Sequence, residues 1–75
     1  MLFRSRGVIA VDPKVIPLGT RVYVETVGKG QDYGYAIAAD TGGAIKGNII
    51  DLYYDTRMEA MNWGRRNVKV YIIND

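Results

Sequence analysis

Alternating hydrophobic and polar positions along the chain predict a domain built mainly from β-strands. The apolar run over residues 8–11 is followed by Asp12-Pro13, and a buried strand should end there because proline cannot donate to a sheet ladder. Valines at alternate positions mark two further strands, each with one face in the core. The predicted strands span residues 8–11, 21–26, 35–39, 49–54 and 68–72.

Two glycine-rich segments separate these strands. Residues 28–32 predict a hairpin loop, so the strands on either side of it should pair antiparallel. Residues 41–48 contain three glycines in eight positions, which is typical of a loop whose backbone lines a site.

A short helix is predicted near the C-terminal end. Thr56-Arg57-Met58-Glu59 has the form of a capping box, and Gly64 followed by two arginines ends a helix of about nine residues. Met58, Ala60 and Met61 should form its apolar stripe, and Trp63 should anchor it on the core. We therefore expect a single, mainly β domain over residues 1–75, a small barrel with one helix.

The composition excludes several kinds of chemistry. Among its 75 residues the chain has no cysteine and no histidine, so thiolate nucleophiles, Ser-His-Asp catalysis and zinc sites that use either residue are excluded. Acid-base chemistry must use carboxylates, lysine or tyrosine. We expect no metal and no cofactor.

The charge distribution argues against two kinds of partner. The net charge is +2, and the basic residues are scattered along the chain, which does not favour nucleic acid. No apolar run approaches the roughly 20 residues of a membrane span, and residues 1–6 are too short and polar for a signal peptide.

Three of the six aspartates directly follow or interrupt apolar strands: Asp12, Asp40 and Asp51. Desolvation and a neighbouring like charge would raise the pKa of such a carboxyl group toward the range of a general acid. Aspartate at a strand end is also a common turn former, and local context leaves both interpretations open. The remaining three occupy a hairpin loop, a helix start and the C-terminus: Asp32, Asp55 and Asp75.

A family resemblance selects the same three aspartates. Residues 7–73 resemble the 3D (three-aspartate) domain, with residues 1–6 as a leader that does not match. The segment from Asp40 to Asp51, 11 residues apart, is also similar to the catalytic barrel of membrane-bound lytic transglycosylase A. The matching motifs are Gly7-Val8-Ile9-Ala10-Val11-Asp12-Pro13, Val15-Ile16-Pro17-Leu18-Gly19-Thr20, Tyr35-Ala36-Ile37-Ala38-Ala39-Asp40-Thr41-Gly42-Gly43-Ala44-Ile45-Lys46-Gly47-Asn48, Ile50-Asp51-Leu52-Tyr53 and Trp63-Gly64-Arg65.

The resemblance implies a double-psi β-barrel acting on bacterial peptidoglycan, in secreted wall-remodelling proteins. Its activity would be lytic transglycosylase cleavage of the MurNAc-GlcNAc β-1,4 bond, with a 1,6-anhydro product and Asp40 as general acid and base. Asp12 and Asp51 would hold Asp40 and raise its pKa. Parent proteins would lie outside the cell or in its wall.

The resemblance also implies a set of substrate-binding residues. The amides of Thr41, Gly42 and Gly43 would meet sugar groups, as would Lys46, although Lys46 is equally well explained as a solvated loop cation. Side-chain alternation puts Tyr53, and not Tyr54, on the side of Asp51, where it could face the cleft.

The family begins with one more strand than this sequence offers. Its absence predicts an open sheet edge and a homo-oligomer, formed by edge pairing or by strand exchange between protomers. Two other functional hypotheses remain beside the enzyme: a non-catalytic, expansin-like wall-binding barrel, and an inactive truncated or engineered fragment.

Overall fold

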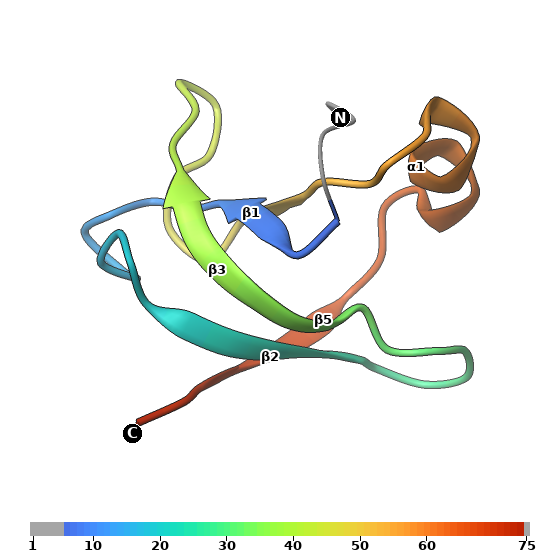
Figure 1. Cartoon of the computed structure of the whole chain (residues 1–75), viewed down its shortest axis with the longest axis horizontal. Helices are drawn as coiled ribbons and strands as arrows, with labels where there is room; N and C mark the ends of the chain where they lie inside the picture. Colours follow the sequence, from blue (N-terminus) through green and yellow to red (C-terminus); the bar gives the residue numbers. More distant parts are fainter. Residues whose placement is uncertain (1–5, 75) are drawn as a thin grey trace.

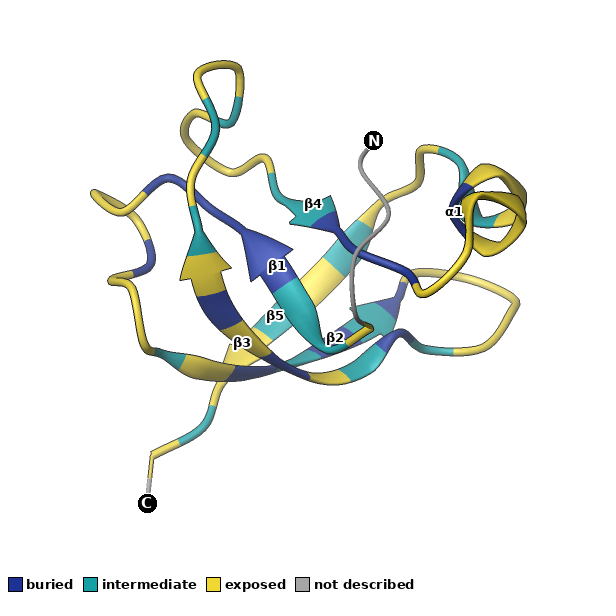
Figure 2. Cartoon of the chain, turned by 45° about the horizontal axis from the view of Figure 1, so that its top comes forward, coloured by how far each residue is buried: buried dark blue, intermediate teal, exposed yellow. Residues whose placement is uncertain are grey.

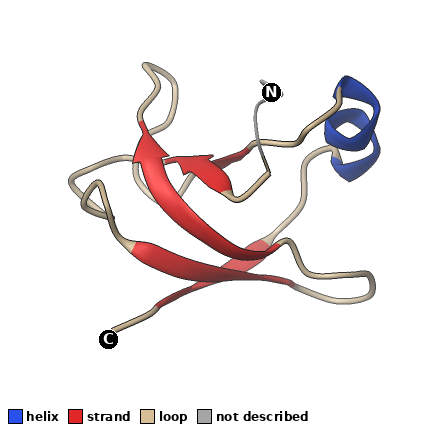
Figure 3. Cartoon of the chain, viewed as in Figure 1, coloured by secondary structure: helices blue, strands red, loops and turns tan. Residues whose placement is uncertain are grey.

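The structure, a computed structural model, describes residues 6–74 of the chain. This part of the chain contains five strands and one helix (Figure 1). The fold is mainly β with one short helix, as predicted, and every predicted strand is present (Figure 3). The elements are β1 (Val8–Ala10), β2 (Arg21–Thr26), β3 (Gly34–Asp40), β4 (Asp51–Leu52), α1 (Arg57–Trp63) and β5 (Val68–Ile72).

The strands form one sheet in the order β4-β1-β3-β2-β5, curved into half of a small barrel (Figure 1). The central pair β1 and β3 runs parallel, and all other pairs are antiparallel, including the predicted hairpin of β2 and β3. β4 and β5 are the two edges of the sheet, and no pairing joins them within residues 6–74.

A β-bulge lies in the central pair of strands. Ile9 pairs with Ala38, but the next residue, Ala10, pairs with Asp40, so Ala39 is the extra residue. Without this bulge Ala10 would face Ala39, and the side chain of Asp40 would point to the opposite side of the sheet. The bulge therefore sets the direction of the Asp40 carboxylate.

The sheet has a core face and an outer face, seen as buried bands that alternate with exposed ones along β3 and with intermediate ones along β2 (Figure 2). The core face is apolar and includes Ile9, Val22, Val24, Ala38 and Leu52. The residues next to these along each strand point the other way. The outer face, as we use the term, includes Ala10, Arg21, Tyr23, Tyr35, Ile37, Asp40, Asp51, Tyr53 and Tyr71.

β4 is shorter than the predicted strand over residues 49–54. Only Asp51 and Leu52 pair with β1, and the amide of Tyr53 adds one bond, to the carbonyl of Val8 at 3.2 Å. β1 has only three residues, so a β4 longer than this would find no further pairing partners on β1.

The helix has seven residues instead of about nine, and it begins as predicted. The Thr56 hydroxyl accepts the amide of Glu59 at 3.1 Å, and the Glu59 carboxylate accepts a hydrogen bond from that hydroxyl. The predicted apolar stripe is wrong: Met58 and Met61 are 72% and 70% exposed, and Ala60 alone is buried in the helix. The helix lies at one end of the half-barrel, so most of its surface faces solvent (Figure 1).

Trp63 anchors the helix on the core, as predicted. Its ring lies 6.1 Å from that of Tyr33 and 5.9 Å from that of Tyr54, centroid to centroid, and it packs against the core cluster.

Within residues 6–74 the structure has no helix long and apolar enough to cross a membrane.

Candidate functional site

Three aspartates frame the glycine-rich loop of residues 41–50, which projects beyond the tip of β3 (Figure 1). Asp40 ends β3 at the start of the loop, and Asp51 begins β4 at its end. Asp12, just after β1, holds the middle of the loop through the amide of Gly47, 2.8 Å from its Oδ2. The loop is thus tied to the sheet at three points.

Both carboxylate oxygens of Asp40 accept hydrogen bonds. Oδ1 accepts the amide of Thr41 at 2.8 Å, and Oδ2 accepts the phenol of Tyr53 at 3.0 Å. Two donors on two oxygens fix the plane of the carboxylate as well as its position. Asp40 itself is partly exposed, so a ligand at the loop can reach it.

Tyr53 reaches Asp40 from the far side of β1, since β1 lies between β4 and β3. The side chain is 1% exposed, although it belongs to the outer face and not to the core cluster. Tyr54 points into the core instead. The two tyrosines therefore lie on opposite faces, with Tyr53 on the face of Asp40 and Asp51.

Asp12 differs from the expectation for a desolvated acid. Its carboxylate accepts the amides of Gly47 and Lys14, at 2.8 and 3.0 Å, and is 9% exposed. These amides, first Gly47 and then Lys14, lower the pKa of Asp12, and the nearby positive charges of Lys46 and Lys14 add to the effect against the opposing influence of desolvation. The prediction of a raised pKa is wrong for this residue, which is held ionised and acts as a tether of the loop.

Asp51 shares the outer face with Asp40, and Ala10 lies between them. Both aspartates pair with Ala10, from opposite sides, so their Cα atoms are two strand spacings apart, about 9–10 Å. Asp51 also borders a hollow of about 680 Å³ between the loop and the segment after α1. Trp63 and Arg66 line the same hollow, whereas Asp40 and Asp12 do not.

The other predicted binding residues lie in the exposed part of the loop. The amide of Ile45 donates to the carbonyl of Gly42 at 3.0 Å, which closes a turn. A Cβ on Gly42 would come within 3.0 Å of the Ile45 side chain, so this turn is built for glycine. Gly43 has open space beside it, and Thr41 and Lys46 are exposed.

The three aspartates do not gather at one point. Within residues 6–74 no three acidic side chains lie close enough together to hold a metal ion. The arrangement offers instead a single carboxylate at the start of the glycine-rich loop. This carboxylate, Asp40, is fixed by the Tyr53 phenol and the Thr41 amide and is partly exposed to solvent.

Tyr33 supports this site and was not predicted from the sequence. Its hydroxyl accepts the amide of Gly7 at 2.7 Å and donates to the carbonyl of Tyr53, so it fixes the backbone of the residue that binds Asp40. Tyr33 is 3% exposed but follows a polar loop, and no local pattern distinguishes it from a solvated loop residue.

Comparison with known proteins places the chain among bacterial relatives. It is 57% identical over 67 residues to the cell wall-binding protein YocH of Bacillus subtilis (strain 168), covering 89% of this chain and 21% of YocH. YabE from the same strain, whose name refers to cell wall shaping, is also 57% identical over 67 residues, covering 89% of this chain and 15% of YabE. The SPbeta prophage-derived protein YorM of that strain is 46% identical over 68 residues, covering 91% and 27%.

The chain thus spans about a quarter or less of the length of these relatives. The family model of the 3D domain matches residues 7–74, which include all three framing aspartates and the whole sheet. This chain belongs to the 3D domain family.

Proposed function

We propose that this domain acts on the bacterial cell wall as a peptidoglycan lytic transglycosylase with Asp40 as its acid and base. The names of the relatives, one cell wall-binding and one referring to cell wall shaping, support the wall as the place of action. The observation that carries the catalytic assignment is the Asp40 carboxylate, held on both oxygens and partly exposed at the start of the glycine loop.

The reaction needs one group that gives a proton and then takes one. Asp40 in its acid form protonates the glycosidic oxygen as the bond from C1 of the muramic residue to that oxygen breaks. The Asp40 carboxylate then removes the proton from the C6 hydroxyl of the same sugar, whose oxygen bonds to C1 and closes the 1,6-anhydro ring. Because the nucleophile belongs to the substrate, no second carboxylate is needed to activate water.

The neighbours of Asp40 have positioning roles in this proposal. Tyr53 holds one carboxylate oxygen, and Asp12 keeps the loop in place through Gly47. The amides of Gly42 and Gly43, together with Lys46, meet the hydroxyl and acetamido groups of the sugars, where fixed donors stabilise developing charge, whereas the Thr41 amide already donates to Asp40. Asp51 lies on the same face, beside the hollow under the loop.

Digestion of purified sacculi tests the proposal, with mass spectrometry of the released fragments. The unsubstituted domain should release 1,6-anhydromuropeptides, and Asp40→Asn should not. Asp55→Asn is the matched control, because Asp55 is an exposed carboxylate beside α1 whose hydrogen bond is to the amide of Arg6. Absence of anhydro products from the unsubstituted domain would refute the enzymatic assignment.

A non-catalytic wall-binding module is the second candidate, favoured by the name of YocH. It predicts that sacculi retain the unsubstituted domain and the Asp40→Asn variant equally well, and that no soluble fragment appears. The same digestion, with protein measured in the pellet, separates the two candidates.

Self-association is part of the proposal, since both edge strands of the half-barrel are open within the described residues. Unpaired strand edges favour pairing with another chain. We expect a homodimer in which β4 or β5 of one protomer pairs with its partner. Light scattering after size exclusion should give twice the monomer mass, and a monomer at high concentration would contradict this part.

A further inference from the structure

Three tyrosines form a row across the outer face of the sheet, away from the glycine loop. Tyr23 of β2 pairs with Tyr35 of β3 on one side and with Tyr71 of β5 on the other. Tyr35 is 74% exposed and Tyr71 48%, so two of the rings present apolar surface to solvent. Paired residues on neighbouring strands point to the same side, which makes the row one continuous surface.

Two of these rings are fixed by carboxylates. The Tyr23 phenol donates to Asp32 at 2.7 Å, and the Tyr71 phenol donates to Glu25 at 2.9 Å. Asp32 also accepts the amide of Thr26, so it is a structural acceptor and not a solvated turn residue. The hydrogen bonds to these carboxylates, followed by desolvation, raise the pKa of both phenols, so their hydroxyls keep their protons well into the alkaline range.

The exposed ring of Tyr35 contacts its cross-strand neighbour, Tyr23. Its centroid lies 4.9 Å from that of Tyr23 at an interplanar angle of 78°, an edge-to-face contact. Because Tyr23 is itself tied to Asp32, the Tyr35 ring rests on a fixed partner. A ring held this way loses little freedom when a ligand stacks on it.

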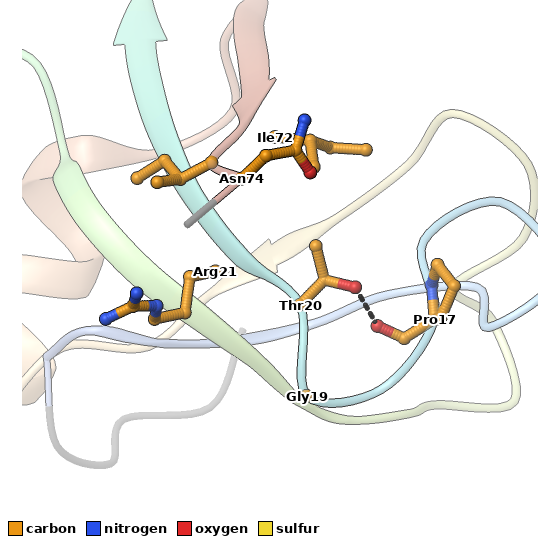
Figure 4. A pocket seen from close by; sticks show the side chains of 7 residues that line it. Pro17, Gly19, Thr20, Arg21, Ile72 and Asn74 are labelled. Carbon is orange, nitrogen blue, oxygen red and sulfur yellow. Dashed lines mark hydrogen bonds between the residues drawn. The ribbon is translucent and has the colours of Figure 1, made fainter.

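A second row continues this surface toward the glycine loop. Ile37, 43% exposed, pairs with Arg21, and the Arg21 carbonyl accepts the amide of Ile73. These three residues and Tyr35 line a hollow of about 420 Å³. Figure 4 shows the adjoining hollow, of about 460 Å³, which Arg21 shares with Thr20 and Asn74.

The outer side of β3 therefore carries Tyr35, Ile37 and Asp40 along one strand. Residues 35 and 40 are separated by about 16 Å of strand, a span of about three sugar rings. The bulge at Ala39 keeps the Asp40 carboxylate on this side. A linear polymer that reaches Asp40 can follow β3 to the tyrosine row.

We propose that the outer side of β3 is the path of a glycan strand, with Tyr35 as a distal stacking subsite and Arg21 beside it. The polymer's class rests on the proposed function; the subsite rests on the geometry of the face. A pyranose ring has one face of C–H bonds, which packs on an aromatic ring, and hydroxyl groups around its edge. Arg21 offers a fork of donors for the carboxylates and acetamido groups of peptidoglycan.

The charges of the face favour a glycan over a second copy of the chain. Arg21, Glu25, Asp32 and Lys69 all lie within or beside the two rows. Burying so many charged side chains in a dry interface between protomers is costly, and the centres of protein interfaces are depleted of them. A polymer rich in hydroxyl groups leaves such charges hydrated.

Binding of purified sacculi, measured by depletion of protein from solution in the Asp40→Asn background, tests the subsite without turnover. Adding Tyr35→Ala should weaken binding about five-fold, since one stacked ring is lost. Tyr35→Phe should stay within about two-fold, because stacking uses the ring and not the hydroxyl. Met58→Ala, which trims an equally exposed apolar side chain on α1, is the control for non-specific adhesion and should change nothing.

Each outcome of this experiment decides the inference. Equal binding with tyrosine or alanine at position 35 would overturn it, and so would an equal loss from Met58→Ala. A change in oligomeric mass on Tyr35→Ala, with sacculus binding unaltered, would assign the face to a second copy and also overturn it. If anhydro products are formed but Tyr35→Ala does not weaken binding, the subsite is wrong and the proposed function stands. If Tyr35 is needed for binding but no anhydro products form, the proposed function is wrong and the subsite stands.

Discussion

The phenol of Tyr53 donates a hydrogen bond to Oδ2 of Asp40 at 3.0 Å, across strand β1 and 13 residues along the chain. Tyr53 is 1% exposed, so the donor cannot swing away into solvent. Thr41 binds the other oxygen through its amide. Asp40 is therefore held in one orientation by a buried side chain and by the loop that it begins.

Tyr53→Phe should lower the rate of anhydro-product release while leaving the affinity for sacculi unchanged. The variant removes one hydrogen bond to a carboxylate, which costs about 1.5–3 kcal/mol for a charged acceptor, and it frees the Asp40 side chain to rotate. Fragment release and thermal unfolding, measured together, check this. Thr56→Ala is the control for a loss of stability away from the site, because it removes a helix cap worth about 1 kcal/mol, and it should leave the rate intact.

Asp12→Asn should make the domain less stable at neutral pH, and this difference should vanish in acid. The backbone amides of Gly47 and Lys14 lower the pKa of Asp12 below its ordinary value of 3.8. The ionised carboxylate therefore stabilises the fold above pH 3.8, and the contribution is lost as the pH falls through the lowered pKa.

Thermal unfolding from pH 7 to pH 2 measures this dependence for Asp12→Asn. Lys46→Gln is the comparison, because it removes a nearby positive charge but neither amide bond, and it should reproduce only a small part of the difference. A gap between the unsubstituted domain and Asp12→Asn that persists unchanged at the lowest pH would show that the ionised form is not what stabilises the loop.

The strands and the helix start were predictable because their determinants are local. Val22 and Val24 alternate with polar residues, and Thr56 lies three residues before Glu59, so pattern and spacing were sufficient. The exposure of Met58 and Met61 was not predictable, because it depends on which side of the helix packs against the rest of the fold, and the helix sequence alone does not carry that information. The length of β4 depends on β1, a neighbour about 40 residues away in the chain.

For the candidate site, the positions of the residues in the strands were predictable, but their contacts were not. Asp40 and Asp51 stand at strand ends, and alternation places Tyr53 on their side. The lowered pKa of Asp12 arises from a bond to Gly47, 35 residues away, and a strand-end position carries no sign of it. The bulge opposite Ile9 and Ala10 is likewise invisible in an apolar run of small and branched residues.

Gly47→Ala should destabilise the domain by about 1–2 kcal/mol through backbone strain alone. Gly47 has φ of 64°, in the left-handed region, and a Cβ there would meet open space. Gly43→Ala is the matched control in the same loop, since its Cβ would also meet open space and its φ is not positive. Chemical denaturation of both variants should show a lower midpoint for Gly47→Ala only; equal midpoints would contradict the strain argument.

Tyr33→Phe should destabilise the domain far more than Tyr35→Phe, although the two tyrosines are two residues apart and lose the same atom. The Tyr33 hydroxyl accepts the amide of Gly7 and donates to the carbonyl of Tyr53, and its loss leaves both groups without that partner at a cost of about 1–3 kcal/mol. Tyr35 is 74% exposed, and a change at its surface hydroxyl should stay within about 0.5 kcal/mol.

The same pair of variants tests whether Tyr33 acts on catalysis through Tyr53. If Tyr33 holds the backbone of Tyr53, and Tyr53 holds Asp40, then Tyr33→Phe should slow anhydro-product release even at a temperature where it is fully folded. Denaturation gives the folded fraction, and fragment release per folded molecule gives the rate. An unchanged rate per folded molecule would limit Tyr33 to stability and leave Tyr53 and Thr41 as the residues that position Asp40.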